Sequence, residues 1–150
     1  MVQPVQANRL ASVLTEAEKQ GSRLVIIDTS PNSENASLLA ARAADLILIP
    51  CRPHLLDIKA IHSSIEIAKL ARKPFFVVMN AVPPRGALGA DAKAAIAQYD
   101  APVAPEHLSM RAAYYHCLVN GQAAQEYEPN GRAAEEATRL YKWTRKQVAM

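Results

Sequence analysis

Cysteine, glycine, aromatic side chains and long apolar runs are all scarce in this sequence. It has two cysteines among 150 residues, and they form no Cys-x-x-Cys unit, so a cystine scaffold is excluded. The longest apolar runs are only four or five residues, against the roughly 18–20 that a membrane span needs. We therefore expect a soluble protein with no membrane partner. Aromatic residues make up 5%, which disfavours an aromatic-rich β-sandwich.

The charge and the length of the chain further limit the classes of protein that it can belong to. Lys and Arg number 17 and Asp and Glu 14, and the resulting net charge of +3 indicates no particular partner. A chain of 150 residues can bury one core without disulfides, so we expect a single domain over residues 1–150. Residues 1–20 are polar and resemble no secretory leader, and the expected compartment is the reducing cytoplasm.

Helical and strand-like patterns alternate along the chain, which predicts an α/β fold. Short buried strands are expected at 23–28, 44–50 and 73–80, with a weak strand around 101–104. Helices are expected at about 10–20, 33–43, 55–68, 90–98, 110–119 and 131–148. Such an order predicts three α/β/α layers around a mostly parallel sheet of about four strands, joined by right-handed crossovers.

In open parallel sheets, ligands bind beyond the carboxyl ends of the strands. The residues expected at this edge are Asp28, Thr29, Ser30, Pro31, Pro50 and Asn80. A carboxylate at the tip of a buried strand, with hydroxyl groups beside it, suits a hydrated Mg²⁺ next to a polyphosphate, which is the Walker B arrangement. An aspartate can equally end a strand simply to begin a turn, so Asp28 alone leaves both interpretations open.

The first half of the chain carries four motifs in order: Leu-Val-Ile-Ile-Asp-Thr-Ser-Pro, Ala-Asp-Leu-Ile-Leu-Ile-Pro-Cys-Arg-Pro, Leu-Leu-Asp-Ile and Phe-Phe-Val-Val-Met-Asn. The tail carries Met-Arg-Ala-Ala-Tyr from 110, Asn-Gly-Gln from 120, Glu-Tyr-Glu-Pro from 126 and Gly-Arg-Ala-Ala-Glu-Glu from 131. In this order the motifs resemble the ParA-type partition ATPases of the ParA/MinD superfamily. The resemblance covers about residues 7–146 and implies a P-loop NTPase-like fold and a role in plasmid or chromosome segregation.

The resemblance also implies roles for individual residues. It assigns Asp28 to catalysis through a water-mediated Mg²⁺ and Thr29, Ser30 and Pro31 to a switch that senses the γ-phosphate of ATP. It places Asn80 and Met110 near the adenine. For the intact family it implies ATP and Mg²⁺ as cofactors. The implied partners are a second copy or another ParA-type subunit, an adaptor protein and nonspecific DNA.

The anion-binding loop of that family, Lys-Gly-Gly-x-Gly-Lys-Thr, has no match among the five glycines. By the family architecture, the first strand of the sheet, which belongs between the strands ending at Asp28 and Pro50, is missing with it. The flanking strands must then close on each other or pair with another chain, because unsatisfied backbone groups each cost about 1–3 kcal/mol. We therefore expect that this chain alone neither binds ATP tightly nor hydrolyses it.

The last predicted helix has an apolar stripe and a basic side. The stripe comprises Ala133, Ala137, Leu140, Tyr141, Thr144 and Val148, and Trp143 is expected to border the basic side. The basic residues, which are candidates for DNA phosphate contacts, are Arg139, Lys142, Arg145 and Lys146. A solvated helix face with ordinary C-terminal cations explains them equally well.

Two other functions compete with an ATPase fragment. One is a catalytically silent family relative that acts by binding a protein or DNA. The other is a cysteine hydrolase on a doubly wound sheet, with Cys51 at a strand end and His54 three residues on. A buried structural cysteine explains Cys51 as well.

Overall fold

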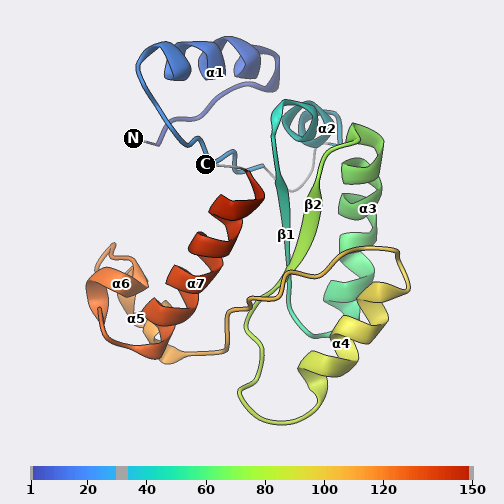
Figure 1. The fold of residues 1–150 in the computed structure, drawn as a ribbon, viewed down its shortest axis with the longest axis vertical. Coiled ribbons are helices and arrows are strands. Elements are labelled where there is room, and N and C mark those ends of the chain that lie inside the picture. The colour runs from blue at the N-terminus through green and yellow to red at the C-terminus, as the bar shows by residue number, and fades with distance from the viewer. Residues whose placement is uncertain (1, 30–33, 149–150) are drawn as a thin grey trace. The chain divides into compact units, whose positions relative to one another are not determined.

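A computed structural model describes residues 2–29 and 34–148 of the chain. The described helices are η1 (Ala7–Arg9), α1 (Leu10–Lys19), α2 (Glu34–Ala43), α3 (Leu55–Ala71), α4 (Leu88–Ala97), α5 (Ala112–Val119), α6 (Ala124–Tyr127) and α7 (Arg132–Gln147), and the strands are β1 (Ile47–Cys51) and β2 (Phe75–Met79) (Figure 1). No helix in the described ranges is both long and apolar enough to cross a membrane.

The chain divides into two compact units. The first holds residues 1–47 and 66–74, and the second holds residues 48–65 and 75–150. The expectation of a single domain stays a prediction.

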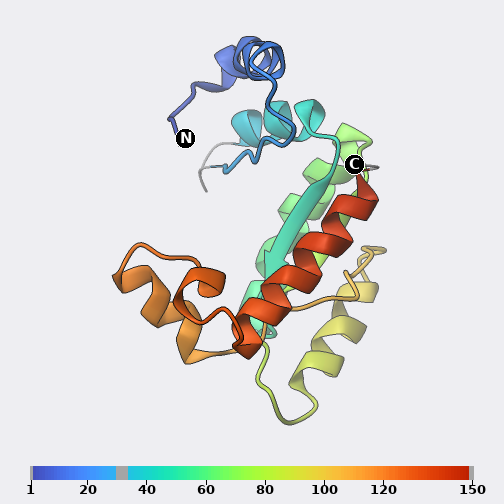
Figure 2. The same cartoon turned by 60° about the vertical axis from the view of Figure 1, so that its left-hand side comes forward.

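The second unit is built on the parallel pair β1 and β2. The two strands run side by side, with α7 along one face and α3 along the other (Figures 1 and 2). The N–H of Asn80 donates to the carbonyl of Cys51 (2.8 Å). Since a parallel ladder bonds every second residue to the same neighbour, Pro50 turns its backbone toward the open edge of β1. A proline fits there because no ladder hydrogen bond is lost.

A third extended segment lies along the other edge of β2. Val77 donates to the carbonyl of Pro102 and accepts from the N–H of Ala104, both at 2.8 Å. Farther along, the N–H of Val82 donates to the carbonyl of Leu108 (3.0 Å), and the carbonyl of Val82 accepts the N–H of Met110 (2.8 Å). These contacts form two isolated parallel bridges, at Val103 and Ser109, rather than a continuous strand. Pro102 and Pro105 lack N–H groups, which limits the ladder here.

The core of the second unit fills both faces of β2. Val77 and Met79 are fully buried, together with Ile65 of α3 and Ile96 of α4. On the opposite face, the rings of Phe76 and Trp143 meet edge to face with centroids 4.9 Å apart. This aromatic contact joins α7 to β2.

The first unit has a much smaller core. Its helices α1 and α2 contact each other and η1, but α1 has no buried residue and α2 buries only Ala40 and Ala41. Gly21, predicted to end the first helix, follows α1 with φ of 79°, a conformation that glycine adopts without strain.

The predicted strand at 23–28 is wrong: these residues form no strand. Leu24 and Val25 are exposed and Ile26 is 83% exposed. A strand needs a neighbour for its N–H and C=O groups, and no described residue pairs with this segment, so its β-forming sequence stays unpaired.

The α/β class is confirmed in coarse form, as helices mixed with a small parallel sheet. The expected sheet of about four strands is wrong for the described residues, which form two: the strand at 23–28 is absent and the one at 101–104 is reduced to a bridge. The predicted helices are found with boundaries shifted by a few residues, and α6 was not predicted.

Candidate functional site

The structure assigns the predicted site residues to different parts of the chain. Asp28 and Thr29 belong to the first unit, whereas Asn80 and Met110 belong to the second. Ser30 and Pro31 lie outside the described residues. Among the described residues, the second unit therefore holds one part of the predicted edge, formed by Asn80 and Met110.

Asn80 and Met110 end neighbouring segments at the carboxyl edge of this small sheet. The side-chain oxygen of Asn80 accepts the N–H of Ala81 (2.9 Å), which leaves its amide NH₂ group exposed to solvent. Ala81 adopts φ of 50°, a turn that the asparagine side chain supports. Met110 is half exposed and is joined to Val82 by its backbone. Both side chains can therefore meet a ligand at this edge.

Asn80 and Met110 are two of the residues predicted to form a nucleotide site. Within the described ranges, no three His, Cys, Asp or Glu side chains gather in a way that could hold a metal ion. A hydrated Mg²⁺ needs only one or two carboxylates, so Asp28 remains compatible with it. The glycine-rich loop that would hold the phosphates has no counterpart in the sequence.

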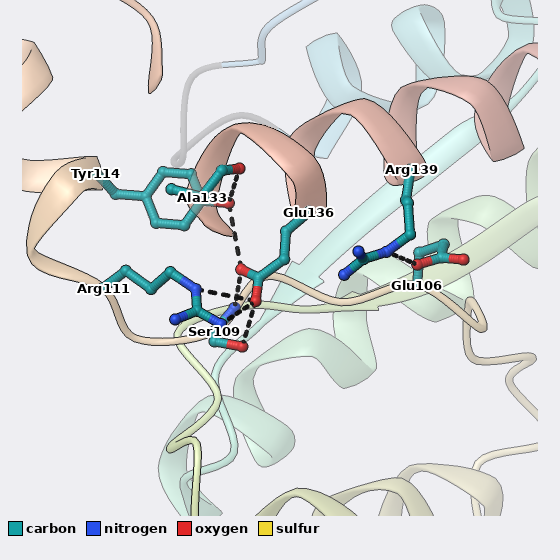
Figure 3. A network of polar contacts seen from close by, with 7 residues as sticks. All are labelled: Glu106, Ser109, Arg111, Tyr114, Ala133, Glu136 and Arg139. Atoms are coloured by element: carbon teal, nitrogen blue, oxygen red, sulfur yellow. Dashed lines mark hydrogen bonds and ion pairs between the residues drawn. The ribbon is translucent and has the colours of Figure 1, made fainter. Parts of the chain in front are cut away.

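The most connected polar cluster of the second unit surrounds Glu136 of α7 (Figure 3). Its carboxylate is almost fully buried. Oε2 accepts the N–H of Ser109 (3.0 Å), and Oε1 accepts the Ser109 hydroxyl (2.8 Å). Arg111 donates to Oε1 from Nε (3.0 Å) and from Nη2 (2.6 Å). Tyr114 donates its hydroxyl to the carbonyl of Ala133 (2.9 Å) and lies 3.4 Å from Oε2.

The electrostatics of this Glu136 cluster follow from burial and pairing. Burial alone would raise the pKa of Glu136, but the hydrogen bonds from Arg111 and Ser109 outweigh it and lower the pKa to about 2. Burial, followed by the nearby Glu136 charge, raises the pKa of Tyr114 to about 12. The hydrogen bond to Glu136 raises the pKa of Arg111. At neutral pH the cluster is a charged pair beside a neutral phenol.

The Glu136 cluster has a structural consequence. It joins α7 to Ser109, which follows the third extended segment, and to Arg111, which precedes α5. These two residues lie 27 and 25 residues before Glu136 in the sequence. Ser109, Tyr114 and Glu136 were not predicted as site residues from the sequence. One signal was available: Glu136 lies three residues after Ala133 and four before Leu140, on the apolar side of the helix, where an unpaired carboxylate is not tolerated.

The basic side of α7 faces solvent. Arg139, Lys142, Arg145 and Lys146 are all exposed. Arg139 borders the buried face, because it lies three residues after Glu136 and four before Trp143. Two of the cations have neighbours. Arg139 donates to Glu106 (3.1 Å), and the Arg145 guanidinium lies 5.8 Å from the centre of the Tyr141 ring.

Two residues of α7 were assigned to the wrong side. Tyr141, expected on the apolar stripe, is half exposed and lies beside Arg145. Trp143, expected to border the basic side, packs against Phe76 of β2. The buried side of α7 includes positions 136, 140 and 143, because Glu136 bonds to Ser109 and the indole of Trp143 packs on Phe76.

Cys51 has the environment of a structural cysteine. Its side chain is buried and its thiol donates to the carbonyl of Arg52 (3.2 Å). Burial, with the charge of Asp57, raises the pKa of the thiol. Since the thiolate is the nucleophile, this environment disfavours the cysteine hydrolase hypothesis.

We expect both cysteines to react slowly with iodoacetamide at pH 7.5, because each is buried. Mass spectrometry of the alkylated protein should show labelling of Cys51 that rises with urea concentration in step with unfolding. Cys117 provides the internal control. Fast labelling of Cys51 alone in native buffer would restore the enzyme hypothesis.

No protein-family model matches the sequence. The chain is 29% identical over 118 residues to the maintenance of carboxysome distribution protein A of Halothiobacillus neapolitanus. The match covers 75% of this chain and 55% of that relative, so the chain spans about half the length of the curated protein it matches. This distant likeness supports a relation to ParA/MinD-like proteins.

Proposed function

We propose that this chain is part of a ParA-like positioning or segregation protein that contacts DNA through the basic side of α7. The main support is the exposed row of Arg139, Lys142, Arg145 and Lys146, held on a fixed helix by the Glu136 cluster. The similar protein from Halothiobacillus is named for the maintenance of carboxysome distribution, which is a positioning role. DNA phosphates provide a sequence-independent track for such a role.

Replacing Lys142, Arg145 and Lys146 by alanine is expected to weaken binding to a random 30-base-pair duplex by about tenfold to a hundredfold at low salt, because each contributes a phosphate contact. Fluorescence anisotropy of labelled DNA measures this. The matched control replaces three cations elsewhere, Lys19, Lys59 and Arg85, and should change the affinity much less. Equal losses in the two triple variants would refute a specific role for α7.

The nucleotide part of the proposal assigns Asp28 to Mg²⁺, Thr29, Ser30 and Pro31 to a switch, and Asn80 and Met110 to the base. We propose that this chain by itself has little affinity for ATP. The reason is that Asn80 and Met110 are exposed groups without a phosphate cradle.

Calorimetric titration of the chain with ATP and MgCl₂ is expected to give no saturable heat at millimolar nucleotide. A coupled assay is expected to give no turnover above a no-protein control. Magnesium-dependent turnover that is abolished by Asp28→Ala would contradict this expectation and would establish an ATPase within these 150 residues. The DNA proposal does not depend on this result.

A catalytically silent binding protein remains the alternative function. Because this chain alone is expected not to bind ATP, the two functions are compared in the presence of a full-length ParA-type subunit that carries the glycine-rich loop. An ATPase part should then change its DNA affinity when ATP is added to the anisotropy experiment. A silent binding protein should bind DNA equally well with and without ATP.

A further inference from the structure

The β1–β2 sheet has one covered edge and one open edge. On its far side, β2 bonds to residues 102–104. The other edge of the sheet belongs to β1, and no described residue pairs with it. Because Ile47 and Cys51 make ladder hydrogen bonds on the β2 side, Leu48 and Pro50 turn their backbones to the open edge. Leu48 offers an N–H and a C=O there, and Pro50 offers a C=O.

The open edge of β1 lacks most of the features that prevent another strand from adding to a sheet. Natural edge strands are protected by charged side chains, by proline or by a covering element. The strand β1 reads Ile-Leu-Ile-Pro-Cys and carries no charge. Its one proline stands near the end of the strand, and the side chain of Leu48 is 37% exposed. The backbone at Leu48 can therefore accept a neighbouring strand.

Residues 23–28 are complementary to this edge. Their run Leu-Val-Ile-Ile has the composition of a strand, yet Leu24, Val25 and Ile26 are all exposed. The predicted strands at 44–50, 73–80 and 101–104 all pair in some form, whereas the segment 23–28 pairs with no described residue. An exposed apolar run of β-forming residues is a segment that readily adds to the edge of a sheet.

Each chain therefore carries both an open edge and an unpaired strand-forming segment. A strand from an unrelated protein would cover the β1 edge but would leave residues 23–28 unpaired. A second copy satisfies both, because two chains can exchange their segments in a closed twofold arrangement in which the same contact forms twice. We propose that residues 23–28 of each chain add to the β1 edge of a second copy, where main-chain hydrogen bonds provide the affinity. This proposal needs neither DNA nor nucleotide.

Sedimentation velocity of the full chain, without DNA or nucleotide, tests the proposal. The wild type is expected to shift from monomer to dimer as its concentration rises from about 1 to 100 µM. Ile26→Pro removes an N–H from the segment and restricts its backbone, and Leu48→Pro removes the N–H at the open edge of β1. Each variant is expected to dimerise at least about tenfold more weakly, because both exchanged contacts lose hydrogen bonds.

A third proline variant provides the matched control. Val2→Pro makes the same kind of change at a fully exposed residue outside the helices and strands, and it should leave dimerisation unchanged. The fluorescence of Trp143, which packs on β2, shows whether each variant is folded. If Leu48→Pro fails to fold, Ile26→Pro still decides the question, because Ile26 is 83% exposed and belongs to no helix or strand.

A mixture of Ile26→Pro and Leu48→Pro gives a result that is specific to this exchange. Either variant alone lacks one member of both contacts. In the mixture, the intact segment of the Leu48→Pro chain can add to the intact edge of the Ile26→Pro chain, which restores one of the two contacts. With one variant fluorescently labelled, the mixture should therefore contain more labelled dimer than the labelled variant forms alone at the same total concentration.

Several results would overturn the proposal. A wild type that stays monomeric over the whole concentration range would leave the β1 edge to a strand of another protein. Wild-type dimerisation by Ile26→Pro, or by folded Leu48→Pro, would show that the dimer uses other surfaces. Equal weakening by Val2→Pro, or a mixture with no added dimer, would exclude pairing of the segment with the edge. Growth beyond the dimer would show open-ended association in place of a closed exchange.

Discussion

Glu136→Gln is expected to lower the free energy of unfolding by about 3–5 kcal/mol, because it leaves the Arg111 guanidinium partly buried without its counter-charge. The loss is a large share of the roughly 5–15 kcal/mol typical of natural proteins. Urea denaturation followed by the fluorescence of Trp143 measures it. This is the single tryptophan, and it packs against Phe76 in the same unit.

The neighbouring residue provides the matched control. Glu135→Gln removes the same charge one position away on the exposed side of α7 and should cost less than about 0.5 kcal/mol. A double variant, Arg111→Met with Glu136→Leu, removes both charges and should recover part of the lost stability. Recovery is partial because the N–H and the hydroxyl of buried Ser109 lose their acceptor. If Glu136→Gln is no more destabilised than Glu135→Gln, the Glu136 cluster does not hold α7 in place.

Acid is expected to destabilise the second unit through the same carboxylate. The pKa of Glu136 is about 2 in the folded chain, against an ordinary value of 4.5. A carboxyl group with a lowered folded pKa adds stability above its unfolded pKa, and that stability is lost as the pH falls from about 4.5 toward 2. The contribution at neutral pH is about 3–4 kcal/mol.

Urea midpoints measured between pH 7 and pH 2.5 test this dependence. The wild-type free energy of unfolding should fall below pH 4.5 more steeply than that of Glu136→Gln, so the difference between the two proteins should shrink as acid is added. Glu135→Gln should follow the wild type. Parallel curves for wild type and Glu136→Gln would show that Glu136 titrates alike in the folded and unfolded chain.

Much of the fold was predictable because its helices carry local signals. The spacing of Ile58, Ile61 and Ile65 predicted α3, and these residues are buried as expected. The strand β2 was predicted from its unbroken apolar run, which requires cover on both faces. Boundaries were less accurate because caps and prolines compete within a few residues.

What the sequence did not reveal depends on distant partners. Residues 23–28 have every local feature of a strand and still form none, because a strand needs a neighbour and the described chain offers none. The Glu136 cluster was missed for a related reason. Its members are brought together across more than twenty residues, and neither Ser109 nor Tyr114 has a local signature of that contact.

The central claim is that α7 is a DNA-contacting helix fixed by the Glu136 cluster. The most direct test is the salt dependence of DNA binding. The slope of log affinity against log salt should be about 2–3 units less steep for the Lys142, Arg145 and Lys146 alanine variant than for wild type, since each lost phosphate contact removes about 0.9. Identical slopes for the two proteins would contradict the account.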